Sequence, residues 1–292
     1  MKPTLDITPR NSYRPLEKSR LKEQSEFDLI ITQTKFDLKR MLEGSWAKAP
    51  IIFSGLLWYV TTLFTVSRLS IQSILPIDYW NTFKDSLSLF TAPREGAGGL
   101  LIGIGLAVIG SGLIADDNAS KAHTIYATKI SKRTYILSKI LTMLAIVFIS
   151  LFLWAFLLYF IVIYKTGPPL SGIIEHWYFL TNLVILFVVY SMTIGGIALF
   201  FSSITDRSLV AGVLILVIPL LIQFIGTLIL YDVTGISLFL ALGPYNTVLI
   251  VWDKLWGGTY KYAQYMPEAV FSMILYFSLG LWALFKASND RK

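Results

Sequence analysis

The stretch Leu113–Lys139, "LIADDNASKAHTIYATKISKRTYILSK", is a polar segment between two of the most apolar runs of the chain. It carries two acidic and five basic residues, whereas residues 96–112 and 140–164 on either side carry none. A charged side chain is costly inside hydrocarbon, so a segment with this many charges is expected outside it. The stretch therefore predicts a point where the chain leaves a membrane and then enters it again.

The composition supports a membrane protein with several spans. The 292-residue chain is 55% hydrophobic and only 15% charged, with a mean hydropathy of +0.64, whereas soluble domains are about one-quarter charged. A helix needs roughly 20 apolar residues to cross the hydrocarbon core, and at such lengths only helices satisfy their own backbone there. We predict an all-α integral membrane fold with six transmembrane helices, at about 49–67, 96–115, 138–164, 177–204, 208–231 and 269–286.

The basic residues predict the orientation of these spans. If both termini are cytoplasmic, 19 of the 25 Lys and Arg residues fall on the inner side, as the positive-inside rule requires. The net charge of +7 is then explained by membrane orientation and by anionic lipid headgroups rather than by nucleic-acid binding. We expect a multi-pass protein of the cell (plasma) membrane.

A seventh apolar run, residues 233–252, is predicted not to span. Gly243-Pro244 divides it, and glycine and proline together break a helix. Each half has ten residues or fewer, about 15 Å of helix, which is too short to cross. A seventh span would also place Lys286, Arg291 and Lys292 outside. We therefore predict a re-entrant or interfacial segment between spans five and six.

The region before span one is predicted to lie outside the membrane. Residues 1–24 read as a mobile cytosolic tail, and residues 25–45 as an amphipathic helix along the inner interface, ahead of a six-span domain at 49–286. The helix either anchors the chain at the interface or has a more specific mechanical role. Its apolar side consists of Phe27, Ile30, Ile31, Thr34, Leu38, Met41 and Leu42, and its polar side of Asp28, Lys35, Asp37, Lys39 and Arg40.

Several kinds of chemistry are disfavoured by what the chain contains. It has no cysteine, and its two histidines, His123 and His176, are far apart in sequence. We therefore expect no metal or cofactor in this chain. No P-loop, HExxH or GxSxG motif occurs, so the chain is not expected to be an enzyme or to hydrolyse ATP. Ion-coupled carriers usually need an ionisable residue within a span, and the apolar runs hold none.

The polar stretch itself predicts a short helix beneath the membrane, at about 117–129. Asp117 is a suitable N-cap, and its charge suits a helix N-terminus. Ser131 is expected to cap span three, and Lys132, Arg133 and Lys139 to lie at the level of the headgroups. The alternative is a solvated charged connector, which needs neither a cap nor an amphipathic pattern.

This stretch resembles the first intracellular loop of ABC-2-type permeases, the membrane subunits of type V ABC transporters. Four features match: an acidic pair, an aromatic position in the short helix, a Ser-Arg element and a final lysine, at Asp116-Asp117, Tyr126, Ser131-Lys132-Arg133 and Lys139. The departures are Lys129 where proline is usual, Ser138 for a glycine, and Ser120-Lys121 for the frequent Gly-Thr. The order of an interfacial helix, six spans and a broken segment before the last span also resembles that family.

The resemblance implies a permease subunit of an ATP-driven ABC transporter, in a family that mostly exports its substrates. Two permease chains would pair, as a homodimer or a heterodimer, and separate P-loop ATPase subunits would supply the ATP and Mg²⁺ sites. Residues 25–45 would be the connecting helix and the short helix the coupling helix. The residues expected to dock on the ATPase are Asp116, Asp117, Lys121, Ile125, Tyr126, Lys129 and Arg133.

The translocation pathway is expected between the two permease chains, along spans two and five. An uncharged, apolar lining favours lipid-like, hydrophobic or peptide-like cargo. The candidates are Thr61 and Thr62 on span one, Gly103 on the glycine-rich span two, and Gln223 and Thr227 on span five. The alternative function is a membrane anchor or scaffold subunit that does not transport, since a docking helix serves it equally well.

Overall fold

The computed structural model describes residues 25–43, 110–118, 131–166, 169–256 and 263–289, and all of their regular elements are helical. The tail at 1–24, span one at 49–67, most of span two and most of the coupling helix at 117–129 lie outside these residues. The same holds for seven of the predicted site residues, which are Thr61, Thr62, Gly103, Lys121, Ile125, Tyr126 and Lys129.

The elements follow one another as helices joined by short turns. The first part comprises α1 (Glu26–Glu43), a helical segment at 110–118, α6 (Lys132–Val147), the π-helical η2 (Phe148–Phe152), α7 (Leu153–Thr166) and α8 (Pro169–Glu175). The middle comprises α9 (Trp177–Tyr190), the π-helical η3 (Ser191–Gly195), α10 (Gly196–Ile204), α11 (Ser208–Phe224) and the π-helical η4 (Ile225–Tyr231). The last part comprises α12 (Asp232–Thr234), α13 (Ser237–Ala241), α14 (Pro244–Trp256), η5 (Ala263–Tyr265) and α15 (Met266–Asn289).

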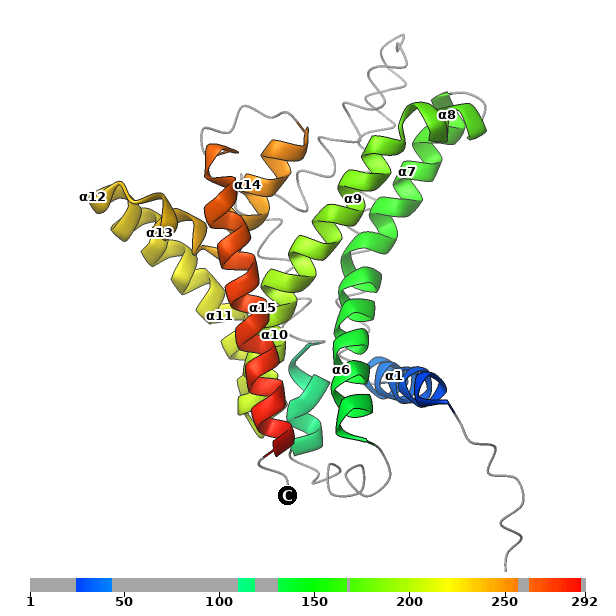
Figure 1. Cartoon of the computed structure of the whole chain (residues 1–292), viewed down its shortest axis with the longest axis vertical. Coiled ribbons are helices and arrows are strands. Elements are labelled where there is room, and N and C mark those ends of the chain that lie inside the picture. The colour runs from blue at the N-terminus through cyan, green and yellow to red at the C-terminus, as the bar shows by residue number, and fades with distance from the viewer. Residues whose placement is uncertain (1–24, 44–109, 119–130, 167–168, 257–262, 290–292) are drawn as a thin grey trace, which may run out of the picture.

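Three helices among the described residues are long and apolar enough to cross a membrane: Trp177–Ile204, Ser208–Thr234 and Ala263–Asn289. A fourth long helix runs without interruption from α6 through η2 to α7 and contains the shorter apolar segment Ala155–Tyr164. These helices form an upright bundle, and α1 lies across the base of α6 (Figure 1). We call this end of the molecule the α1 end.

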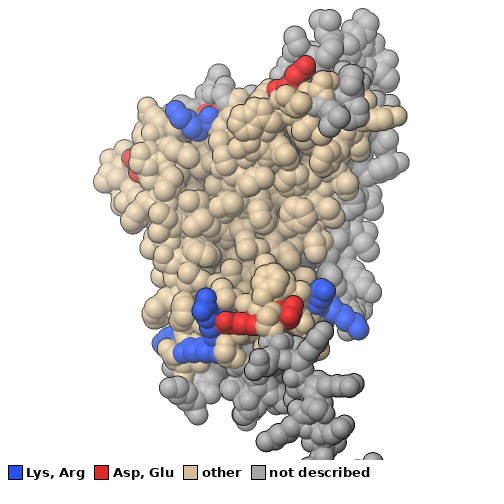
Figure 2. Space-filling view, turned by 45° about the vertical axis from the view of Figure 1, so that its right-hand side comes forward, with Lys and Arg blue, Asp and Glu red and all other residues tan. Residues whose placement is uncertain are grey.

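Charged side chains gather at the ends of the bundle. On the face drawn in Figure 2, a band of basic and acidic residues lies at the α1 end and a few charges lie at the opposite end, while the surface between them is uncharged. Many large apolar side chains are exposed between the two ends, among them Phe160, Val213 and Trp282. Such a belt is the surface that a membrane protein presents to lipid.

Glycine allows two of the long helices to touch. A Cβ on Gly196 of α10 would overlap the backbone of Tyr276 and Phe277 on α15, and a Cβ on Gly280 would overlap the backbone of Gly196. In lipid, small residues at a crossing let helices approach closely and gain van der Waals contact. Spans four and six therefore pack backbone against backbone at this crossing.

Two helix ends lie where short-range features of the sequence predict them, at Ser131 and at Gly243-Pro244. The Ser131 side chain accepts a hydrogen bond from the Thr134 amide (3.0 Å) and caps α6, as its position predicts. The apolar run 233–252 breaks into α13 and α14 at Leu242-Gly243. However, α14 continues to Trp256 and is longer than the ten residues expected. Packing explains the extension, since the Trp256 ring lies 4.8 Å from the ring of Phe179 on α9.

Candidate functional site

Four charged side chains from three elements meet at the α1 end, and we call Asp37, Arg40, Asp117 and Lys139 the ionic cluster. The Lys139 ammonium lies 2.9 Å from an Asp37 carboxylate oxygen and 2.7 Å from one of Asp117. The Arg40 guanidinium lies 2.5 Å from the other oxygen of Asp117. The side chains of Asp37, Asp117 and Lys139 are all 0% exposed. Two cations and two anions therefore balance in the interior.

Neutral groups complete the cluster. The Tyr135 hydroxyl donates to Asp117 Oδ2 (3.2 Å), and the Gln33 amide donates to Asp37 Oδ1 (3.3 Å). The Lys139 ammonium also lies 5.3 Å from the centre of the Tyr135 ring, close enough for a cation–π interaction. Further hydrogen bonds of this kind offset the cost of removing charges from water.

The two carboxylates differ in their electrostatic surroundings. Burial alone would raise the pKa of Asp117, but Lys139 and Arg40, both in direct contact, hold this pKa below its usual value of 3.8. For Asp37, burial is the stronger influence and raises its pKa, although Lys139 acts in the opposite direction. Asp117 is therefore the more firmly ionised member of the pair.

The cluster joins segments that are far apart in sequence. Asp37 and Arg40 lie on α1, Asp117 lies at the end of helix 110–118, and Lys139 lies in the second turn of α6. The helices before and after residues 119–130 are therefore joined by the contact between Asp117 and Lys139. Removing one member of a buried ion pair leaves an uncompensated charge, so the three segments are strongly held together.

The start of this connection is also joined to α10. The Ser202 hydroxyl accepts hydrogen bonds from the Ile114 amide (2.8 Å) and the Ala115 amide (3.2 Å). The Asn118 amide group donates to the Thr205 carbonyl (2.9 Å) at the end of that helix. Helix 110–118 is thus fixed to α6 on one side and to α10 on the other.

A second polar site joins span five to the α13–α14 hairpin. The Gln223 side chain accepts a hydrogen bond from the Asn246 amide (3.2 Å), and the Asn246 side chain donates to the Thr227 hydroxyl (2.7 Å) and the Leu240 carbonyl (3.0 Å). On the same span, Gln223 and Thr227 line an open cavity of about 560 Å³. The other lining residues, Val217, Leu220, Leu221 and Phe224, are apolar.

Side chains also satisfy the carbonyls that the break in the hairpin leaves free. The Thr247 hydroxyl donates to the Ala241 carbonyl (2.7 Å), and the Tyr276 hydroxyl on α15 donates to the Leu242 carbonyl. Broken helices are tolerated at membrane depth where such groups find partners within the protein. The hairpin is thereby joined to both span five and span six.

A comparison with protein families identifies the chain. The family described as ABC-2 family transporter protein matches residues 14–246. The chain belongs to this family. It is a membrane permease component of an ABC transporter, and the family implies association with an ATPase subunit. A search of curated proteins found no match.

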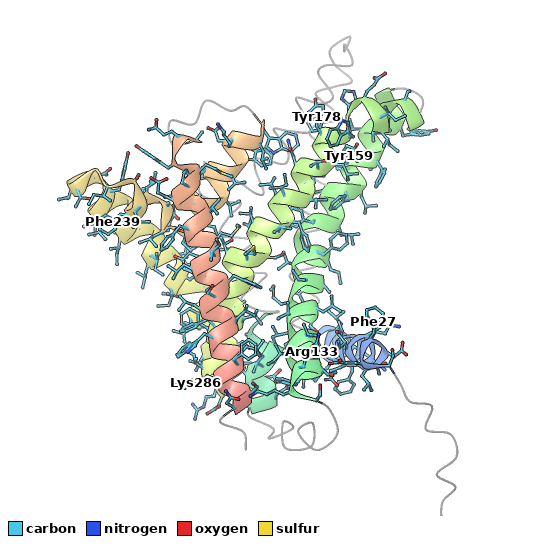
Figure 3. The ribbon with its side chains drawn as sticks, viewed as in Figure 1. Phe27, Arg133, Tyr159, Tyr178, Phe239 and Lys286 are labelled. Carbon is cyan, nitrogen blue, oxygen red and sulfur yellow. The ribbon has the colours of Figure 1, made fainter. Side chains whose placement is uncertain are left out.

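The structure of this ABC-2 permease places five of the predicted site residues. Asp117 is buried in the ionic cluster, whereas Arg133 is exposed and lies 3.9 Å from Glu26 of α1. Figure 3 shows Arg133 beside α1 at the same end as Phe27. Asp116, next to Asp117, is partly exposed. Gln223 and Thr227 both line the cavity on span five. The described docking residues and the described pathway residues therefore lie in two separate regions of the permease.

Three expectations about single residues in the permease were wrong. Asp117 does not cap a following helix, because it lies inside helix 110–118 and turns toward Lys139. Lys139 does not present its ammonium to the headgroups, because its side chain is 0% exposed and two buried carboxylates bind it. Asp37 does not share the exposed side of the amphipathic helix with Lys35 and Lys39, because it lies on the buried face of α1 with Thr34 and Met41, while Phe27 stays 69% exposed.

Sequence reasoning also missed Asp37, Arg40 and Lys139 as members of a site. One signal was available, since a lysine in the first residues of an apolar span needs a counter-charge nearby. The two candidates were the acidic pair at the end of span two and the single acid in the middle of the amphipathic helix. In the structure Lys139 binds one residue from each, Asp117 of the acidic pair and Asp37 of the amphipathic helix.

Proposed function

We propose that this permease receives force from separate P-loop ATPase subunits on the connection at 116–133, and that the ionic cluster transmits this force to the spans. The observation that carries the proposal is the contact of Lys139 with Asp117 and Asp37, which joins the helices before and after that connection to each other and to α1. A displacement of the connection would move α1, α6 and helix 110–118 together. ATP and Mg²⁺ would be bound by the ATPase partner.

The pathway is proposed to lie along span five, between two permease chains in the plasma membrane. Its support is the open cavity that Gln223 and Thr227 line with four apolar residues. An apolar surface with few polar groups suits a lipid-like, hydrophobic or peptide-like cargo. The proposed direction is export, with both termini and α1 on the cytoplasmic side and the hairpin entering from the outer side.

The test begins with the partner. The tagged chain is purified in mild detergent, and co-purifying subunits are identified and assayed for ATP hydrolysis. We expect a subunit with a P-loop motif to co-purify, and the substitutions Tyr126→Ala and Arg133→Glu to weaken its association. A matched control is Lys254→Glu, an exposed basic residue at the opposite end of the bundle, which should leave the complex intact.

A second step separates transport from anchoring. If the ATPase binds but hydrolysis does not move apolar cargo across a vesicle membrane in either direction, the scaffold function is supported instead. If the chain purifies without any ATPase, and nucleotide has no effect on it, the docking proposal is wrong.

A further inference from the structure

Four buried hydroxyls in the middle of the bundle have no hydrogen-bond partner among the described residues. They belong to Tyr190 at the end of α9, Ser191 in η3, Tyr245 in α14 and Ser272 in α15. Each of these residues is at most 3% exposed. We call them the hydroxyl cluster. A buried polar group without a partner costs free energy, and in folded proteins such groups are rare.

This lack of partners is not the usual state of a hydroxyl on these helices. Thr193, two residues after Ser191, donates to the Val189 carbonyl (2.7 Å), and Thr142 on α6 donates to the Ser138 carbonyl (2.7 Å). Serine and threonine in membrane helices commonly bond to a carbonyl one turn earlier in this way. Ser191 and Ser272 have the same option and do not use it.

The four residues come from elements that pack against one another. Contacts join α14 to α9, η3 and α15, and also join α15 to η3. Tyr190 lies at the end of α9 and Tyr245 near the start of α14, and these two helices contact each other. These contacts place both phenol groups at the junction of spans four and six with the hairpin.

The glycine crossing places the two serines at the same level. Spans four and six run in the same direction (Figure 1), and Gly196 packs against the backbone of Tyr276. Ser191 precedes Gly196 by five residues and Ser272 precedes Tyr276 by four, so both lie roughly 6 Å above the crossing. Tyr276 also bonds to the Leu242 carbonyl, and Tyr245, three residues further on, lies in the first turn of α14, which contacts both α15 and η3.

We propose that this junction holds ordered water, one molecule or more, hydrogen-bonded by the hydroxyl cluster. Buried water in proteins makes two to four hydrogen bonds to groups that would otherwise lack partners, and every member of the cluster is able to donate and to accept. The α14 helix would then contact spans four and six through water as well as through direct bonds. Hydrogen bonds to water are exchanged more easily than a packed contact is rebuilt, so the site allows the hairpin to shift against both spans. This proposal does not depend on the cargo or on the ATPase.

Substitutions that remove one oxygen atom test the site. In the full chain in lipid nanodiscs, Tyr190→Phe and Tyr245→Phe should each lower Tm by about 2–4 °C, because each leaves the water with one partner fewer. The fall in Tm of the double variant should be smaller than the sum of the two single falls, because both substitutions act on the same water. Tyr178→Phe is the matched control, since Tyr178 is exposed on the same span as Tyr190. If Tm is unchanged or rises in both single variants, the junction is dry and the proposal is wrong.

Footprinting gives an independent measurement on the unmodified protein. X-ray radiolysis turns a bound water into a hydroxyl radical in place, which oxidises the side chains that touch it. We expect Tyr190 and Tyr245 to be oxidised several-fold faster than Tyr159, which is equally buried but donates directly to the His176 carbonyl (3.2 Å). Equal and slow oxidation of all three tyrosines would overturn the proposal even if the variants had lowered Tm.

Discussion

The ionic cluster and the α13–α14 hairpin both place polar groups inside an apolar chain, but they satisfy these groups with different chemistry. The cluster at the α1 end uses four formal charges within 4 Å of a counter-charge. Around the break in the hairpin, the contacts with spans five and six use amides, hydroxyls and carbonyls, as in the bond from Asn246 to Thr227. A carboxylate takes part further along, where Ser237 at the start of α13 donates to Glu268 of α15 (2.7 Å). The difference follows from position along the bundle.

Burying a charged side chain costs less free energy at the end of a membrane bundle than in its middle. The cluster lies at the end where other charged residues gather (Figure 2), and its member Arg40 is 28% exposed, so the buried charges lie close to the surface. The bond from Tyr276 to Leu242 lies on a helix whose central part carries no charged residue. At that depth an unpaired charge would cost far more than an unpaired amide. The comparison therefore predicts large effects at the cluster and moderate ones at the hairpin.

The largest effect is expected from Lys139→Met. The substitution leaves Asp37 and Asp117 facing each other, with Arg40 as the remaining cation of the ionic cluster, and breaking a buried ion pair costs about 3–5 kcal/mol. We expect a large fall in Tm of the purified chain and loss of the bound ATPase. Lys132→Met, at an exposed position on the same helix, should leave both unchanged. A stable Lys139→Met protein that retains its ATPase would show that the cluster does not position the connection.

The second effect separates the two carboxylates. At pH 7, Asp117→Asn should cost about 3 kcal/mol, because Lys139 and Arg40 each lose a buried counter-charge. Asp37→Asn should cost about 1 kcal/mol, because burial already opposes ionisation of that residue. Thermal unfolding of the two variants beside the natural protein measures the difference. Equal costs would mean that both carboxylates are equally ionised in the fold.

The pH dependence of the same two variants gives a further check with opposite signs. The pKa of Asp117 is lowered, so its contribution to stability is present above 3.8 and is lost only as pH falls through the still lower folded value. The pKa of Asp37 is raised, so its contribution is full below 3.8 and is lost as pH rises through the folded value. As pH falls from 7 to about 4.5, the stability of the natural protein relative to Asp37→Asn should rise. Its stability relative to Asp117→Asn should stay the same over this range.

The two regions also differ in how far the sequence predicted them. The hairpin break was predictable because Gly243-Pro244 acts locally, and the Ser131 cap was predictable for the same reason. The ionic cluster was not, because Asp37 and Lys139 are separated by 102 positions. Helical periodicity indicates which residues share a face, but it does not say whether that face meets lipid, water or another helix. Asp37 was therefore grouped with exposed residues such as Lys35, whereas it lies beside Thr34 on the face of α1 that contacts α6.

A moderate effect is expected from Asn246→Ala in the hairpin. The substitution removes the side-chain hydrogen bonds to the Leu240 carbonyl and to Thr227. The Leu240 carbonyl still accepts from the Gly243 amide (3.2 Å), so the cost is that of the lost bonds, about 0.5–1.5 kcal/mol each. We expect a smaller fall in Tm than for Lys139→Met, together with reduced transport. Thr181→Val is the control, because this exposed hydroxyl bonds only within its own helix. A cost as large as that of Lys139→Met would remove the contrast between charged and neutral sites.

The smallest effect on stability is expected from Arg133→Glu, and it sharpens the comparison most. The Arg133 side chain is 78% exposed and lies 3.9 Å from Glu26, itself 49% exposed, and surface ion pairs of this kind contribute about 0.5 kcal/mol or less. Tm should therefore be unchanged. Association with the ATPase should nevertheless weaken, because a charge on the exposed side of the connection is reversed. Buried charges would then position the connection and exposed charges would bind the partner; unchanged association with unchanged Tm would exclude Arg133 from the docking surface.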